Sequence, residues 1–165
     1  MAKKDELTFE ASAYLQTLIG RELFQREDFA LVELIKNAYD SGASKVVITI
    51  QPASEREPGK ITVFDDGSGM DLAAFRQSFM FAGYSERPSQ VMTAKRVPTG
   101  EKGVGRFATD RLGTRLTVTT KTRAPGSALK VDIDWTQFSD RKKKFSDVSA
   151  PFSTVQGHRF GRGSG

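Results

Sequence analysis

The sequence predicts an α+β protein, a two-layer sandwich in which helices cover one face of a mixed β-sheet. Apolar residues recur with a helical period in two early segments, and runs rich in β-branched residues follow them. Short connections join most neighbouring strand segments, which favours hairpins over the long crossovers of a doubly wound parallel sheet. The chain of 165 residues is about the size of one domain and can bury a sizeable core.

Two helices open the expected order of elements. The first covers residues 9–24, and the second begins after an N-cap at Asp28 and stops at Gly42. The apolar side of the first helix is expected to consist of Tyr14, Leu15, Leu18 and Ile19. The apolar residues expected to be buried on the second are Leu31, Val32, Leu34, Ile35 and Ala38.

The later elements alternate between strands and short helices. Residues 82–99 are polar, carry two prolines and show no sustained period, so a loop of this length predicts a functional lid or a disordered segment. From 141 to 165 the chain is polar and glycine-rich, which predicts a domain over 1–140 and a basic tail that is a truncated remainder of it. The expected elements are strands over 45–50 and 60–64, a helix from Asp71 to 81, a helix over 106–112, and strands over 115–121 and 129–135.

Composition narrows the class of protein. The hydrophobic content of 38%, with 12 Phe, is that of a globular chain, and the absence of cysteine excludes disulfides and thiolate metal sites. No apolar run approaches the roughly 20 residues that span a bilayer, and the N-terminus lacks the apolar stretch of a signal peptide. We therefore expect a soluble cytoplasmic protein.

The net charge of +5 comes partly from the basic run 141–144. Basic segments attract phosphates, but most charge runs are solvated faces. Aromatic residues do not alternate with the basic ones as they do in proteins that stack on single strands. Nucleic-acid binding is left open without support.

The second helix carries a polar stripe. At 100° per residue, Glu33, Asn37 and Asp40 fall within about 60° of one another on an otherwise apolar helix. Such a stripe faces water, as on an ordinary amphipathic helix, or it lines a polar cavity. In a cavity the Asn37 oxygen suits Mg²⁺, Glu33 can take a proton from a water attacking a γ-phosphate, and Asp40 can bind nucleotide.

Two glycine-bearing stretches extend this pattern. Asp65 follows a strand and can accept a hydrogen bond from an adenine amine, while Gly67, Gly69 and Met70 allow close approach and apolar contact. A plain turn explains the same residues.

The second stretch opens a helix. Backbone amides there favour an anion, and a lysine adds positive charge. A flexible hinge is the alternative. Together the three stretches predict a pocket for ATP and its metal. The residues of this stretch are Gly100, Lys102, Gly103, Val104 and Gly105.

In order and spacing, residues 33–40, 65–70 and 100–105 resemble the GHKL ATPases, which include gyrase B, ninety-kilodalton heat-shock, MutL, MORC and histidine-kinase proteins. The resemblance covers about residues 20–135, and the stretch 100–108 is most similar to bacterial chaperone-like and MORC-like members. It implies the Bergerat fold, with nucleotide between the helices and a lid at 82–99.

The resemblance also implies roles. Glu33 would be the general base, Asn37 the Mg²⁺ ligand and Asp65 the adenine-reading carboxylate. The glycines at 67 and 69 and Met70 would border the base, and residues 100–105 would contact phosphates. Lid closure on ATP and a homodimer of a larger protein are implied as well.

Two other functions remain open at this stage. Hydrolysing relatives usually take a phosphate-contacting Lys or Arg from a following domain and close the sheet with a further strand, and neither is present here. A regulatory nucleotide-binding module with no significant hydrolysis is therefore an alternative. A kinase acting on a separate protein is another, since the single histidine, His158, lies in the tail and is unsuited to autophosphorylation.

Overall fold

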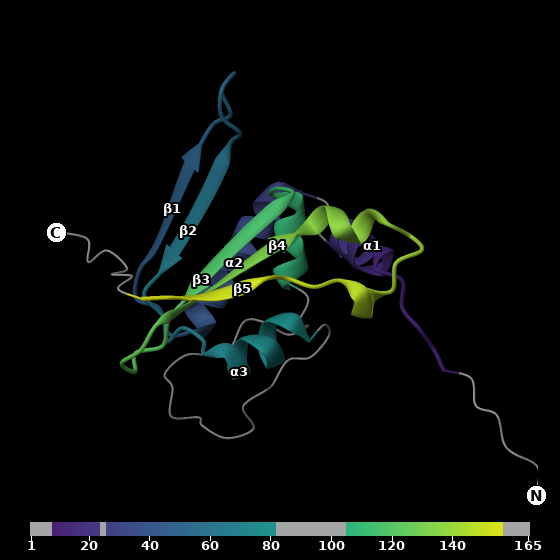
Figure 1. Ribbon diagram of the computed structural model, residues 1–165. Coiled ribbons are helices and arrows are strands. Elements are labelled where there is room, and N and C mark those ends of the chain that lie inside the picture. Colours follow the sequence, from purple (N-terminus) through teal and green to yellow (C-terminus); the bar gives the residue numbers. More distant parts are fainter. Residues whose placement is uncertain (1–7, 24–25, 82–104, 157–165) are drawn as a thin grey trace, which may run out of the picture.

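The computed structural model describes residues 8–23, 26–81 and 105–156 of the protein (Figure 1). The described part of the chain contains helices and antiparallel strands, so the α+β class is confirmed. The elements are α1 (Tyr14–Leu23), α2 (Glu27–Asp40), β1 (Val46–Gln51), β2 (Lys60–Asp65), α3 (Leu72–Phe75), the π-helix η1 (Arg76–Met80), the 3₁₀ helix η2 (Gly105–Arg111), β3 (Arg115–Thr120), β4 (Ala128–Asp134), the 3₁₀ helices η3 (Trp135–Ser139) and η4 (Phe145–Asp147), and β5 (Phe152–Val155).

The described strands pair in two antiparallel sheets. β1 and β2 form a hairpin with Val46 opposite Asp65, and β3, β4 and β5 form a second sheet in that order. The sequence analysis expects one mixed sheet instead. A parallel pair needs a crossover that returns the chain to the same sheet. The crossover from β2 through α3 and η2 delivers β3 to β4, where it pairs antiparallel.

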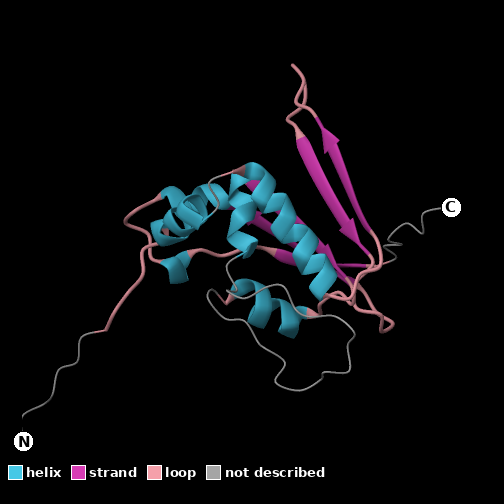
Figure 2. Ribbon diagram, turned by 180° about the vertical axis from the view of Figure 1, so that it is seen from behind, coloured by secondary structure: helices cyan, strands magenta, loops and turns pink. Residues whose placement is uncertain are grey.

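The core lies between the three-stranded sheet and the helices. Alternate residues of β4, Leu129, Val131 and Ile133, are buried in one cluster with Phe107 of η2 and Phe75 of α3. This alternation is what the two-residue period of a strand with one covered face produces. α2 lies behind this sheet in Figure 1 and in front of it in Figure 2, so it covers one face.

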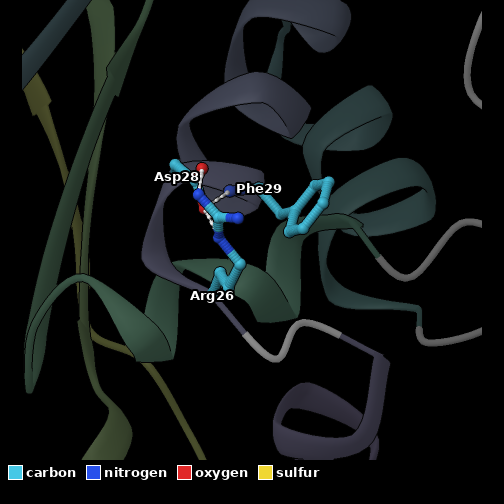
Figure 3. Close-up of polar contacts among 3 residues, drawn as sticks. All are labelled: Arg26, Asp28 and Phe29. Carbon is cyan, nitrogen blue, oxygen red and sulfur yellow. Dashed lines mark hydrogen bonds and ion pairs between the residues drawn. The ribbon is translucent and has the colours of Figure 1, made fainter.

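The start of α2 differs from the prediction. Asp28 is not the N-cap but lies in the first turn, and Arg26 occupies the cap position without a side-chain cap bond. The Arg26 guanidinium donates twice to the Asp28 carboxylate, at 3.0 and 2.6 Å, which also accepts from the Phe29 amide (Figure 3). An acidic side chain in the first turn still stabilises the positive end of the helix dipole.

The apolar sides expected on the first two helices are partly wrong. On α1 the polar Gln16 and Thr17 are buried while Leu15 and Leu18 are exposed, because α1 packs on η2 and η3 through its other side. The Thr17 hydroxyl finds acceptors on Gln16 and on the Phe138 carbonyl. On α2 the residues Val32 and Ile35 are exposed and the buried positions are Ala30 and Ala38.

Residues 141–156 do more than the expected polar tail would. β5 pairs with β4, Phe145 and Val148 pack against the core, and Ser12 and Lys144 form a bridge between the N-terminal segment and this region. Within the basic run, Lys144 pairs with Glu10 at 2.7 Å and the Arg141 guanidinium lies over the Tyr14 ring. These contacts favour a structural use of the basic run. The division of the chain at residue 140 stays a prediction.

Candidate functional site

The polar stripe predicted on α2 is present. Glu33 is half-buried, and Asn37 and Asp40 follow on the same side of the helix as exposed residues. At 100° per residue, Ala30 lies about 60° from Glu33 and is buried against Ala108 of η2, and the buried Ala38 lies further round the helix, beyond Asn37. The stripe therefore runs beside the packed side of the helix, at the edge that faces η2.

One end of the stripe meets the start of η2. A Cβ built on Gly105 would lie 2.7 Å from Oε2 of Glu33, so only a glycine admits this carboxylate so close to the backbone. The other carboxylate oxygen, Oε1, accepts from the Lys36 ammonium at 2.8 Å. Residues 72 positions apart in sequence, 33 and 105, are thus brought together as the sequence analysis expects of one site.

The other end of α2 meets the turn at 65–70. The Ser68 amide donates to the Ser41 carbonyl at 3.0 Å, and a Cβ on Gly67 would fall on the Ser41 hydroxyl. From Glu33 to Ser41 the helix rises about 12 Å, at 1.5 Å per residue. Gly105 thus borders α2 at its middle and the turn at 65–70 borders its C-terminal end, a separation on the scale of an extended nucleoside triphosphate.

The same turn is fastened to β3. Gly69 has a φ of +65°, and a Cβ there would fall on the Lys121 carbonyl, so both the backbone conformation and the close approach require glycine. The Met70 amide donates to the Thr120 hydroxyl at 2.8 Å, and the Met70 side chain packs against the core. The sequence analysis missed Thr120 and Lys121, because no local pattern shows that β3 ends beside this turn.

Two neighbouring carboxylates behave differently in the turn. Asp65 is exposed, and its Oδ1 accepts only a local bond from the Gly67 amide at 2.9 Å among the bonds described, which leaves its face open to a ligand. Asp66 accepts from the Ser44 hydroxyl and from the Ser44 and Lys45 amides. These donors hold the pKa of Asp66 at about 2, with the Ser44 hydroxyl as the largest cause. Asp66 is therefore a structural residue that joins the turn to the start of β1.

Arg106 is a second residue that sequence reasoning missed. Its buried guanidinium donates to the carbonyl oxygens of Ser78 and Phe81, at the end of η1. Burial lowers the pKa of Arg106 to about 10, so the group remains charged at neutral pH. It fixes the start of η2, and with it Gly105, to the end of the α3–η1 helix.

Part of the predicted site lies outside the described residues. Gly100, Lys102, Gly103, Val104, the expected lid at 82–99 and His158 all belong to that part. Within the three described ranges, no group of three or more acidic or histidine side chains forms a metal cage. Mg²⁺ needs no such cage when phosphates supply its other ligands. The exposed Asn37 amide, one turn after Glu33, fits a shared ion of that kind.

A comparison with protein families matches residues 25–159 to the histidine kinase-, DNA gyrase B- and HSP90-like ATPases. The chain belongs to this family. The match spans α2, both glycine-bearing segments and the three-stranded sheet, so the resemblance carried by the three motifs is confirmed. A search of the curated proteins finds no match.

As a member of the ATPase family, the chain is a nucleotide-binding domain of the GHKL type with an α+β Bergerat fold. No helix in the described part of the chain is both long and apolar enough to cross a membrane. Its special likeness to chaperone-like and MORC-like members, its dimerisation and its cytoplasmic location stay predictions.

Proposed function

We propose that this chain binds Mg²⁺-ATP along α2 and hydrolyses it slowly, with Glu33 as the general base. The observation that carries the proposal is the approach of the Glu33 carboxylate to Gly105, the last glycine of the predicted phosphate loop. A general base must lie within hydrogen-bond reach of the water that attacks the γ-phosphate. The position of the Glu33 carboxylate beside Gly105 supports that role.

The other proposed roles belong to residues along α2 and in the turn that follows β2. Asn37 would share Mg²⁺ with the phosphates, which neutralises charge that develops during phosphoryl transfer. Asp65 would accept a hydrogen bond from the adenine amine at the C-terminal end of the helix, and Met70 would border the base. The exposure of Asn37 and Asp65 supports these roles, since a ligand can reach both.

Binding is tested by calorimetry with Mg²⁺-ATP on the wild type and on Asp65→Asn. We expect the substitution to weaken binding at least tenfold, because an amide presents a donor where the adenine amine needs an acceptor. Asp140→Asn is a matched control, since Oδ1 of Asp140 also accepts a local amide bond at 2.9 Å, from Lys142. Equal affinity of wild type and Asp65→Asn would contradict the role of Asp65.

Hydrolysis is tested by phosphate release from Glu33→Ala. We expect binding to persist and turnover to fall by roughly a hundredfold or more, the usual contribution of a positioned general base. Turnover equal to that of the wild type in a clean preparation would remove Glu33 from the mechanism.

A regulatory module that binds nucleotide without significant hydrolysis is the second candidate. The Lys36–Glu33 ion pair favours it, because it engages one oxygen of the proposed base. Wild-type phosphate release at the level of the Glu33→Ala variant, with nucleotide binding intact in both, would select this candidate.

A further inference from the structure

We propose that Lys36 binds the γ-phosphate of ATP and makes the site prefer ATP over ADP. The inference rests on the proposed function, and it gives a role to a cation that lies within the stretch 33–40 but has no role in the sequence analysis. It begins from the position of the Lys36 ammonium, 2.8 Å from Oε1 of Glu33.

The proposed role of Glu33 as general base determines how far Lys36 lies from the γ-phosphate. If Glu33 activates the attacking water, one hydrogen bond joins the carboxylate to the water, and the γ-phosphorus lies about one further contact away, within roughly 6 Å. The Lys36 ammonium already touches that carboxylate. A lysine side chain is long, rotatable and a point-like donor, so small changes at its end bring the ammonium onto a phosphate oxygen.

Charge supports the same assignment. The described polar residues between Glu33 and the turn at 65–70 are mainly acidic, namely Glu33, Asp40 and Asp65. A triphosphate entering beside them needs positive charge at its γ end, where it carries the most negative charge. Lys36 lies about 60° around α2 from Glu33 and has a side chain 41% exposed, so it is accessible to a ligand.

The Lys36–Glu33 pair is partly exposed and joins residues three apart on one helix, and pairs of this kind contribute little to stability. The Lys36–Glu33 pair is therefore easily exchanged for a bond to phosphate. When the ammonium moves to the γ-phosphate, Oε1 of Glu33 is released to accept from water. Lys36 thus links the presence of the γ-phosphate to the availability of the base.

The experiment is calorimetry with the β,γ-imido analogue of ATP and with ADP, each with Mg²⁺, on the full 165-residue chain. For Lys36→Met we expect about tenfold weaker binding of the analogue, the loss typical of one charge-assisted hydrogen bond, and ADP affinity within about twofold of the wild type. Lys36→Arg keeps the charge and should retain most of the preference for the analogue.

Lys130→Met is the matched control. Lys130 has a side chain 42% exposed, and it pairs with Asp132 at 3.4 Å on β4. This variant should bind both nucleotides as the wild type does. Circular dichroism and thermal unfolding establish that each variant is folded.

The possible outcomes distinguish a failure of the Lys36 inference from a failure of the proposed ATP binding. Loss of analogue binding alone supports the role of Lys36. Unchanged binding, or equal loss of both nucleotides, in a folded Lys36→Met protein overturns it while leaving ATP binding established. A folded wild type that binds neither nucleotide overturns the proposed function, and the inference with it.

Discussion

The three-stranded sheet and the β1–β2 hairpin are made of similar residues in opposite surroundings. On β4, Ile133 is 8% exposed and alternates with polar neighbours that face outward. On β1, Ile50 is 61% exposed, and Val47 and Ile48 are exposed on either side of the strand. Branched apolar residues therefore determine that both segments are strands, whereas the layer packed against them determines whether they are buried.

The candidate site lies where these two regions meet. The turn at 65–70 follows the exposed hairpin, yet its two final residues, Gly69 and Met70, are fastened to the end of β3. α2 shows the same division, with Ala30 and Ala38 buried and an exposed apolar stripe of Phe29, Val32, Ile35 and Tyr39. The well-packed region thus supplies the fixed wall of the site, and the hairpin supplies Asp65.

The largest expected effect comes from truncating the same residue type in both regions. Ile133→Ala should lower the free energy of unfolding by roughly 2–5 kcal/mol, because it removes buried methyl groups and leaves a cavity. Ile50→Ala should cost less than about 1 kcal/mol, as exposed positions usually do. Urea unfolding of the two variants measures the difference. Similar losses in both would mean that the hairpin is covered as well as β4 is.

A smaller effect is expected from alanine at two glycines with positive φ. Gly42→Ala should cost about 1 kcal/mol, because its φ of +78° disfavours a side chain but nothing lies within 4 Å of the added Cβ. Gly69→Ala should cost more, up to about 3 kcal/mol, because the strain at +65° is joined by the clash with Lys121. Thermal unfolding of both variants tests this order, and the reverse order would contradict the fastening of the turn to β3.

The smallest effect is a dependence on pH at the junction of the hairpin. The pKa of Asp66 is lowered from 3.8 to about 2, so its stabilising bonds to Ser44 and Lys45 are fully present above about pH 4 and are lost as the pH falls toward 2. Wild type should therefore be more stable than Asp66→Asn at pH 7, and the gap should close over that window. Asp132 and Asp134, whose pKa values are also lowered by threonine donors, titrate equally in both proteins. A gap unchanged at pH 2 would remove Asp66 from this role.

Local sequence signals predicted most elements. The cap at Asp71, which accepts from the Ala74 amide at 2.8 Å, and the stop at Gly42 are both confirmed. The strands after residue 45 begin and end within about a residue of the predicted bounds. The sequence analysis did not predict β5. Its four residues, 152–155, lie in a polar context and become a strand only by pairing with β4.

The sequence by itself identified the residues to which we assign chemistry. The spacing of Glu33, Asn37 and Asp40 follows from the pitch of a helix, and glycines mark the places where the backbone is approached closely. These are local properties, since they depend on bonds within one turn of chain. The family match covers the segments that hold these residues.

Only the tertiary structure decided which of these residues meet. It brought Gly105 to Glu33, joined Gly69 to Lys121, and placed polar Gln16 and Thr17 inside while Leu15 and Leu18 remained outside. The physical reason is that burial and contact depend on which surfaces pack together across long separations in sequence. An apolar stripe fixes what a helix can cover, and the neighbouring elements decide whether it is covered.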